Sequence, residues 1–371
     1  MGKADTKFLH IIPPERYSMS KYIRMTIWDF ERSNHTFLCN TYAQKGSDEI
    51  LLYGNVLDWR AVPTKRVKKI AMINQMTKQA DVIIFHSFVP TWPWLVYLYM
   101  HPAVRKKSTF VLWERDLFGL KIWKKGRWRK ILQRPLERMA MHCKQNFGAY
   151  VTGIPPYAEL ASKFSENIQI APYEFYEHVF ETADSWREQK AATNKTRVWV
   201  SNYVTGAPEL FQQLNKFSNE DIRLFTFEDK RETDDVCLDQ LGCRIFEKTF
   251  RFPVRLSEQR MIKLISALDI GIFDQYMYTN TFHMLMFLYM GKKVFLHEDN
   301  PWYAFFKKKG LDVYTIESID TMSFGEFSAP ALNPEAGNWI KEYFSHDNVA
   351  HAWGKVFETL SNTLAKERKR Q

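Results

Sequence analysis

The stretch from Ser257 to Ile316 alternates apolar runs with short polar turns, and it predicts helices and strands in alternation. Ser257 is an expected N-cap, because Ser accepts a hydrogen bond from the first helical amides. The helix after it has apolar residues at i, i+3, i+4 and i+7, which line one face: Met261, Leu264, Ile265 and Leu268.

Two more strand and helix pairs follow in the same stretch. The expected strands are 270–273, 294–296 and 313–316. Asn280 and Asn300 are expected N-caps, Pro301 suits a first helical position, and Gly291 and Gly310 are expected helix stops. Strands about 20 residues apart with a helix between them predict a parallel sheet, whose carboxyl edge binds ligands. We therefore expect function in the loops 274–281 and 297–300.

The rest of the chain repeats this alternation. Further strands are expected at 8–12, 37–41, 50–53, 82–86, 110–113, 147–152, 197–200 and 224–227, and helices at 19–30, 65–80, 92–101, 155–163 and from Pro208. The polar stretch 172–196 is interpreted as a linker and first crossover. The prediction is an α/β protein of the GT-B architecture, with two Rossmann-like domains whose parallel sheets face each other across a cleft. Residues 1–180 and 181–371 would form the two domains, with the last helix a candidate to pack back on the first.

Ionisable residues end two expected strands of the first half. His86 follows one strand, and Glu114 and Asp116 follow the next. A histidine or carboxylate at a strand tip suits a general base, so these three are the catalytic candidates. The alternatives are a hydrogen-bonded core histidine for His86 and an ion pair with Arg115 or a helix start for Asp116.

The second half offers candidates for binding an anionic donor. The sequence has no Asp-x-Asp metal motif, so a diphosphate would be neutralised by helix N-termini and hydroxyl side chains, with no metal and no cofactor. The donor-binding candidates are Ser201, Asn202, Glu228, Tyr276, Thr279, Asn280, Thr281, Glu298, Asp299 and Asn300. For Thr279, Thr281 and Asn300, ordinary helix capping is the competing interpretation.

The charge of the chain favours an anionic partner. The net charge is +10, and basic residues interleaved with tryptophans gather between 121 and 138. The predicted membrane patch consists of Lys121, Trp123, Lys124, Lys125, Arg127, Trp128, Arg129 and Lys130. Such a surface suits anionic lipid headgroups. A solvated helix face and a nucleic-acid surface are the alternatives.

Four cysteines without CxxC spacing indicate neither a zinc ribbon nor a disulfide framework. The apolar start at 8–12 is too short for a signal peptide, and 85–100 is shorter than a membrane span. The expectation is a cytoplasmic protein, peripheral on the inner face of the cell membrane.

Several segments carry a resemblance to a known family. Residues 85–92, the run Leu112-Trp113-Glu114-Arg115-Asp116-Leu117-Phe118, residues 151–153, the loop from Ser201, residues 268–291 and the run Asp299-Asn300-Pro301-Trp302-Tyr303 resemble the TDP-Fuc4NAc:lipid II Fuc4NAc transferases, which are GT-B enzymes. The similarity is collinear from about Phe8 to Trp353. The family has small residues where this chain has Glu114 and Arg115.

The resemblance implies a glycosyltransferase that moves a sugar, such as an amino or deoxy sugar, from a nucleotide-diphosphate donor to a lipid-linked or cell-surface glycan acceptor. A UDP-sugar transferase for a soluble or protein acceptor is a close alternative. Two others are a basic nucleic-acid-binding protein and an inactive GT-B scaffold.

Overall fold

The structure is a computed structural model. In it the chain folds into two compact units. It describes residues 6–12, 19–39, 55–58, 66–87, 92–113, 127–162, 164–165, 168–173, 177–187, 195–201, 207–228, 245–246, 249–253, 256–274, 281–331 and 336–370. The first unit contains residues 1–175 and 346–371, and the second contains 176–345. The sequence analysis placed the division after residue 180. The C-terminal helix belongs to the first unit.

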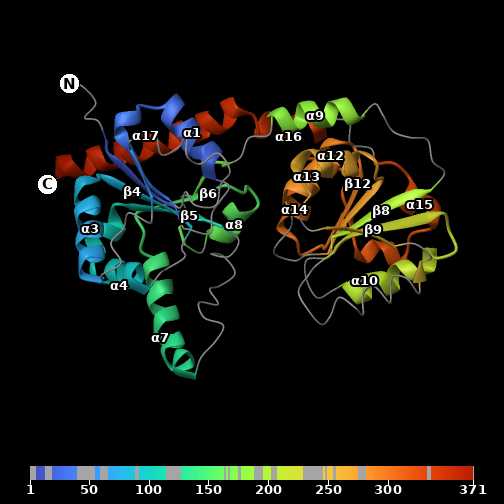
Figure 1. The fold of residues 1–371 in the computed structure, drawn as a ribbon, viewed down its shortest axis with the longest axis horizontal. Helices are drawn as coiled ribbons and strands as arrows, with labels where there is room; N and C mark the ends of the chain where they lie inside the picture. Colours follow the sequence, from blue (N-terminus) through green and yellow to red (C-terminus); the bar gives the residue numbers. More distant parts are fainter. Residues whose placement is uncertain are drawn as a thin grey trace. The chain divides into compact units, whose positions relative to one another are not determined.

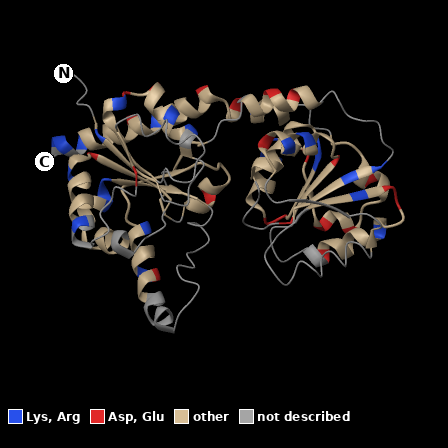
Figure 2. Cartoon of the chain, in the orientation of Figure 1, with Lys and Arg blue, Asp and Glu red and all other residues tan. Residues whose placement is uncertain are grey.

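The first unit is built on a seven-stranded parallel sheet in the order β3-β2-β1-β4-β5-β6-β7 (Figure 1). Its strands are β1 (Phe8–Ile11), β2 (His35–Cys39), β3 (Val56–Asp58), β4 (Val82–His86), β5 (Ser108–Leu112), β6 (Ala149–Thr152) and β7 (Ile168–Ile170). These strands are almost free of Lys, Arg, Asp and Glu, with Asp58 the exception (Figure 2). Strands this apolar are covered on both faces, as parallel sheets require.

Helices cover the two faces of this sheet. The helices of the first unit are α1 (Ser20–Asp29), α3 (Arg66–Gln79), α4 (Trp92–Met100), α5 (Pro102–Lys106), α7 (Arg127–Lys144), α8 (Tyr157–Ala161) and α17 (His346–Arg370). The short helix η2 (Arg32–Asn34) precedes β2. Phe8 and Ile12 pack against α1 and α17, whereas Leu9 and Ile11 pack on the opposite face with α3, α4 and α7 (Figure 1). Alternate residues of β1 thus serve two separate cores.

The second unit has a six-stranded parallel sheet in the order β10-β9-β8-β11-β12-β13. Its strands are β8 (Thr196–Ser201), β9 (Ile222–Glu228), β10 (Thr249–Pro253), β11 (Ile270–Phe273), β12 (Lys293–Leu296) and β13 (Tyr314–Thr315). Its helices are α9 (Glu177–Arg187), α10 (Ala207–Leu214), η4 (Asn215–Phe217), α12 (Glu258–Ser266), α13 (Thr281–Tyr289), α14 (Pro301–Lys308), η5 (Glu317–Asp320), α15 (Phe324–Ser328) and α16 (Ala336–Tyr343). One core unites the sheet with α10, η5 and α15.

The helix ends of the second unit agree with their sequence signals. The Ser257 side chain accepts from the Arg260 amide, and the Asn300 side chain accepts from the Trp302 amide. Gly291 and Gly310 have φ of +67° and +74°, the left-handed conformation that ends helices. These four predictions are confirmed. Asn280 lies outside the described residues.

Other expectations need correction. The stretch taken as a linker contains α9, whose residues pack on α12. The strands β3, β7 and β10 were not predicted, and the expected strand at 50–53 lies outside the described residues. β3 and β7 have three residues each, which is too few positions for a periodic pattern. Within the described residues, no helix combines the length and the apolarity that crossing a bilayer needs.

Candidate functional site

The carboxyl ends of three neighbouring strands meet in the second unit. Phe273 of β11 pairs with Ser201 of β8 on one side and with Leu296 of β12 on the other. Ser201 and the residues directly after Phe273 and Leu296, Asp274 and His297, therefore lie along one edge of the sheet. This edge is where open parallel sheets bind ligands.

His297 joins two carboxylates at this edge. Its Nε2 lies 2.5 Å from Asp274 Oδ1, and its Nδ1 lies 2.9 Å from Glu317 Oε1. The Asp274 and His297 side chains are 7% and 10% exposed, whereas Glu317 is 53% exposed. We call these three residues the His297 cluster. It ties together the residues that follow β11, β12 and β13.

The pKa values of the cluster reflect these bonds. Burial lowers the pKa of His297, but the hydrogen bonds and charges of Asp274 and Glu317 outweigh it, and the pKa lies above its ordinary value. Burial also raises the pKa of Glu317, but hydrogen bonds from His297 and from the backbone amides of Glu317 and Glu298 leave it below its ordinary value. The imidazolium and the Glu317 carboxylate thus stabilise each other.

Two helices begin in the crossovers that follow β11 and β12. Thr281 is the first residue of α13, and it is half-buried. Asn300 is 1% exposed and caps α14, with Pro301 at the first helical position. Its amide donates to the His297 carbonyl oxygen at 3.0 Å, so the turn places the start of α14 beside the cluster. Helix N-termini favour anionic groups.

The other described donor-binding candidates have distinct surroundings. Glu298 and Asp299 are exposed in the turn between β12 and α14. Ser201 is 3% exposed at the end of β8. Glu228 ends β9, which pairs with β8 and β10 and is not a neighbour of β11 or β12. Ser201 thus ends β8, Asn300 lies in the turn after β12, and Thr281 begins the helix of the crossover after β11. Glu228 ends a strand farther along the sheet.

His86 lies inside the first unit, where it belongs to a row of three buried histidines. His10 Nδ1 lies 3.0 Å from His86 Nε2, and His10 Nε2 lies 2.9 Å from His35 Nδ1. The Tyr173 hydroxyl lies 2.6 Å from His86 Nδ1, and the Tyr22 hydroxyl lies 3.3 Å from His10 Nδ1. A neutral imidazole has one N–H donor and one acceptor nitrogen. Three neutral rings can therefore form both contacts, His10 with His86 and His10 with His35, when each contact contains one N–H.

Aromatic side chains of α1 and α17 surround the histidine row. Phe357 contacts His10 and His35, and Trp353 contacts His86. Burial lowers the pKa of His86 to about 3 and that of His35 to about 4. Burial and the neighbouring rings also hold the pKa of His10 well below its ordinary value. Because His86 is fully buried and bonded at both nitrogens, its position favours the core alternative over a general base.

The remaining candidates lie partly outside the described residues and partly in α7. Glu114, Asp116, Asn202, Tyr276, Thr279 and Asn280 lie outside the described residues, as do Lys121, Trp123, Lys124 and Lys125 of the membrane patch. Arg127, Trp128, Arg129 and Lys130 fall at the start of α7. Their roles stay predictions.

The sequence analysis did not predict all members of the His297 cluster or of the histidine row. Asp274 and His297 fall in the two loops expected to matter but were not singled out, and Glu317 was not considered. Histidines 10 and 35 lie within strands, where alternation places them on the same face as Phe8 and Phe37. A polar residue on the apolar face of a strand was the available signal.

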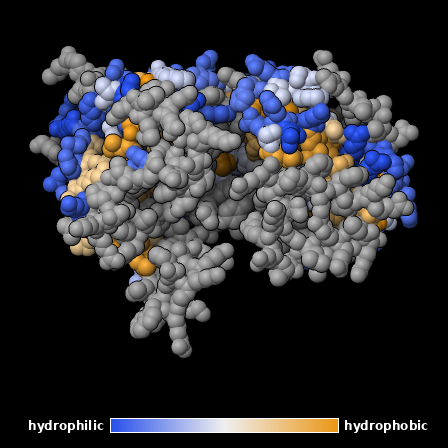
Figure 3. Space-filling model, in the orientation of Figure 1, coloured by the Kyte–Doolittle hydropathy of each residue, from blue (hydrophilic) through white to orange (hydrophobic). Residues whose placement is uncertain are grey.

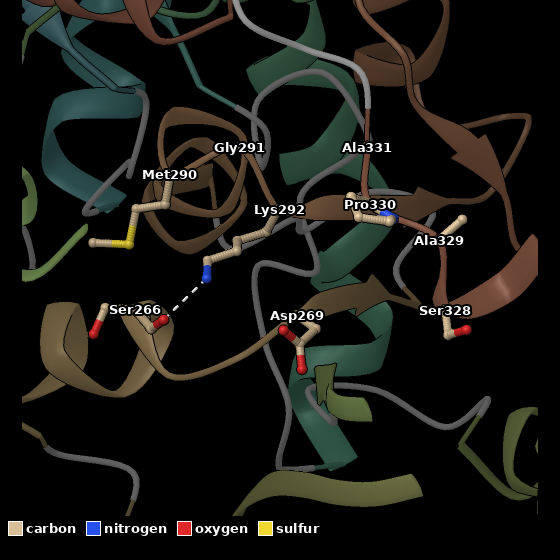
Figure 4. A pocket seen from close by; sticks show the side chains of 9 residues that line it. All are labelled: Ser266, Asp269, Met290, Gly291, Lys292, Ser328, Ala329, Pro330 and Ala331. Carbon is tan, nitrogen blue, oxygen red and sulfur yellow. Dashed lines mark hydrogen bonds between the residues drawn. The ribbon is translucent and has the colours of Figure 1, made fainter. Parts of the chain in front are cut away.

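A pocket of about 210 Å³ opens at the opposite, amino-terminal end of β11 and β12 (Figure 4). Lys292 Nζ donates to the Ser266 carbonyl at 2.9 Å, and Asp269 Oδ2 accepts from the Arg197 amide. Lys292 and Asp269 therefore bind backbone groups of neighbouring segments. The pocket lies at the end of the sheet opposite the carboxyl edge.

Comparison with known proteins identifies the fold. No model of a protein family matches the sequence, and no curated protein sequence matches it significantly. Solved structures do match. Anabaena HepE with UDP and glucose has a TM-score of 0.63 and 11% identity, over 95% of this chain and 100% of that chain. A Rickettsia africae glycosyltransferase has a TM-score of 0.60 and 12% identity, over 96% and 99%. Sucrose-phosphate synthase of Thermosynechococcus elongatus has a TM-score of 0.64 and 8% identity, over 96% and 100%.

The predicted α/β class with two parallel sheets is therefore confirmed, because this protein has the fold of GT-B glycosyltransferases. At these identities the likeness concerns the fold alone.

Proposed function

We propose that this protein is a glycosyltransferase that uses a nucleotide-diphosphate sugar as its donor. The observation that carries the proposal is the carboxyl edge of the second sheet. There the starts of α13 and α14 and the His297 cluster follow adjacent strands, in a fold shared with HepE, whose structure contains UDP and glucose.

The helix starts and the cluster supply different chemistry to a donor. The amides at the start of α13, with Thr281, would hold the diphosphate and stabilise the leaving group as negative charge develops. Ser201 and the Glu298–Asn300 turn would contact hydroxyl groups of the donor. Because the sequence lacks an Asp-x-Asp motif, we propose that helix N-termini rather than a metal neutralise the diphosphate.

The resemblance to the Fuc4NAc transferases supports a finer proposal: an amino or deoxy sugar and a lipid-linked acceptor. The first unit has exposed apolar side chains, as expected of a protein that binds a membrane surface. Tyr99, Met100 and Met141 are 43%, 66% and 43% exposed at the ends of α4 and α7, and the predicted patch precedes and begins α7. On the face drawn in Figure 3, exposed apolar residues occur on both units among hydrophilic ones. Exposed apolar groups suit insertion into a lipid surface, and the basic residues at the other end of α7 would attract anionic headgroups.

A thermal-shift screen against UDP, TDP, GDP, CMP and ADP tests the donor proposal, since a ligand of the folded state raises its stability. We expect one nucleotide to raise Tm selectively, with a smaller shift in Thr281→Ala. No shift with any nucleotide would overturn the proposal, and tight binding to nucleic acid would then favour the nucleic-acid alternative.

Co-sedimentation with vesicles of phosphatidylglycerol and phosphatidylcholine tests the membrane proposal. The wild type should sediment with anionic vesicles, and a Met100→Ser/Met141→Ser variant should sediment less. Equal sedimentation of the two proteins would contradict a role for this surface. A Trp28→Ser variant is the matched control, because Trp28 is 65% exposed on α1.

A further inference from the structure

The Asp274 carboxylate has one oxygen bonded and one not. Oδ1 pairs with His297 at 2.5 Å. Oδ2 is buried, and no group donates to it among the residues that the structure describes. The side chain is only 7% exposed. An unpaired buried carboxylate oxygen costs free energy, so in native proteins such an atom accepts a hydrogen bond from ordered water or from a ligand.

The position of this oxygen relates it to the donor site. Asp274 directly follows β11, and the helix that continues the same crossover, α13, begins at Thr281. The strand and helix of one such unit enclose the ligand site at the carboxyl edge. Asp274 therefore belongs to the same edge as the helix start that would hold the diphosphate.

The charge of the His297 cluster indicates which part of a donor this oxygen would contact. Two carboxylates and one imidazolium leave the cluster net negative. A net negative cluster repels phosphate oxygens and attracts groups that donate hydrogen bonds. The Oδ2 atom can accept a hydrogen bond from an O–H or N–H group, and the donating groups of a nucleotide sugar are uncharged hydroxyls and the N–H groups of its base.

The two other members of the cluster hold the carboxylate in place. His297 donates to Oδ1 and is itself fixed by Glu317 at 2.9 Å. Glu317 accepts in addition from the backbone amide of Glu298. These bonds restrict rotation of Asp274, so Oδ2 keeps one direction. A pre-oriented acceptor loses little entropy when a ligand binds.

We propose that Asp274 Oδ2 accepts a hydrogen bond from an uncharged O–H or N–H group of the bound nucleotide sugar, and that His297 and Glu317 are its positioning residues. The proposal rests on the proposed function and adds a specificity-determining residue to it. The donating group is a sugar hydroxyl, a ribose hydroxyl or an imide N–H of the base.

Titration calorimetry of the full chain distinguishes these groups. The ligands are UDP-glucose, UDP, 2′,3′-dideoxy-UDP and N3-methyl-UDP, or the same changes on whichever nucleotide the thermal-shift screen selects. The proteins are wild type, Asp274→Asn and the control Asp269→Asn, which lies at the other end of β11. Asp274→Asn keeps the size of the side chain but presents an amide.

We expect Asp274→Asn to weaken the binding of UDP-glucose about 10- to 100-fold, as for a hydrogen bond to a charged group. Asp269→Asn should bind within twofold of wild type. Removal or methylation of one of the three candidate groups of the ligand should weaken binding to wild type by a similar factor. The same change of ligand should weaken binding to Asp274→Asn little. That ligand names the group.

Two results would overturn the inference while leaving the proposed function intact. One is a folded Asp274→Asn protein that binds UDP-glucose within twofold of wild type. The other is wild type binding all four ligands within twofold, which needs no variant and decides the matter even if Asp274→Asn does not fold. Wild type that binds none of the screened nucleotides would instead refute the proposed function.

Discussion

His10 and His86 are both fully buried in the first unit, and their ring nitrogens Nδ1 and Nε2 lie 3.0 Å apart. His10 also contacts His35 at 2.9 Å, so it bonds a neighbouring ring at each nitrogen. Three polar rings persist in an otherwise apolar core because they pair with one another and with Tyr173.

Removing the central ring should therefore be costly. His10→Leu leaves His86 Nε2 and His35 Nδ1 buried without their partner, and we expect the free energy of unfolding of the first unit to fall by about 2–5 kcal/mol. Urea denaturation followed by circular dichroism measures it. The control His351→Leu, at an exposed position of α17, should change it by less than about 0.5 kcal/mol. Equal stability of the two variants would contradict the hydrogen-bonded row.

The histidine row also predicts acid sensitivity. The folded pKa values of His35 and His86, about 4 and about 3, lie below the ordinary value of 6.5. The unfolded chain therefore binds more protons below pH 6.5. Stability should be complete above that pH and decrease as the pH falls from 6.5 toward 4, by about 1.4 kcal/mol per pH unit for each ring.

Substituting one ring isolates this effect. His35→Phe retains an aromatic ring against Phe8 and Phe357 and removes one proton-binding group. Denaturation curves between pH 4.5 and 7.5 should show a shallower dependence of stability on pH than in wild type. An unchanged slope would mean that His35 is protonated in the folded protein.

His297 should behave in the opposite way. Its folded pKa is raised, so its pairing with Asp274 and Glu317 is fully present below pH 6.5 and is lost as the pH rises through the folded pKa. NMR titration of histidine ring protons should show one ring titrating above 6.5 that disappears in His297→Gln. In Glu317→Gln its midpoint should move down. A His297 midpoint below 6.5 would refute the ion-paired cluster.

Two glycines differ in what a side chain would meet. A Cβ on Gly148 would lie 1.8 Å from the backbone oxygen of Lys106, whereas one on Gly325 meets nothing within 4 Å. Gly148→Ala should lower the midpoint temperature of unfolding markedly, because backbone must move. Gly325→Ala, in α15, should leave it unchanged or raise it slightly. Calorimetric scans of both variants check the packing of β6 against the turn after α5.

Most strands of the second sheet were predicted from the sequence because their signals, apolar runs and helix caps, lie within the elements themselves. Apolar runs gave β11 at 270–273 with its bounds, and Ser257 and Asn300 marked helix starts through their own side chains. The helix α9 was missed because the charged segment around it suggested a linker, although Val179, Phe180 and Ala183 are buried.

The clusters could not be predicted because they depend on strand order. His10 and His86 are 76 residues apart and meet only because β4 pairs with β1. Glu317 reaches His297 because β13 pairs with β12. Local patterns do not specify which strands are neighbours, so sequence reasoning placed His86 at a strand tip but not its partners.

The central claim is that the second unit binds a nucleotide-diphosphate donor at the carboxyl edge of its sheet. The most direct measurement is calorimetric titration of the full chain with the nucleoside diphosphate that the thermal-shift screen selects. The account predicts one site per chain with a Kd between about 1 μM and 1 mM, in the usual range for enzyme substrates, and weaker binding by Thr281→Ala. No saturable heat with UDP, TDP, GDP or ADP would contradict it, and binding to nucleic acid that declines steeply with salt would then favour the nucleic-acid alternative.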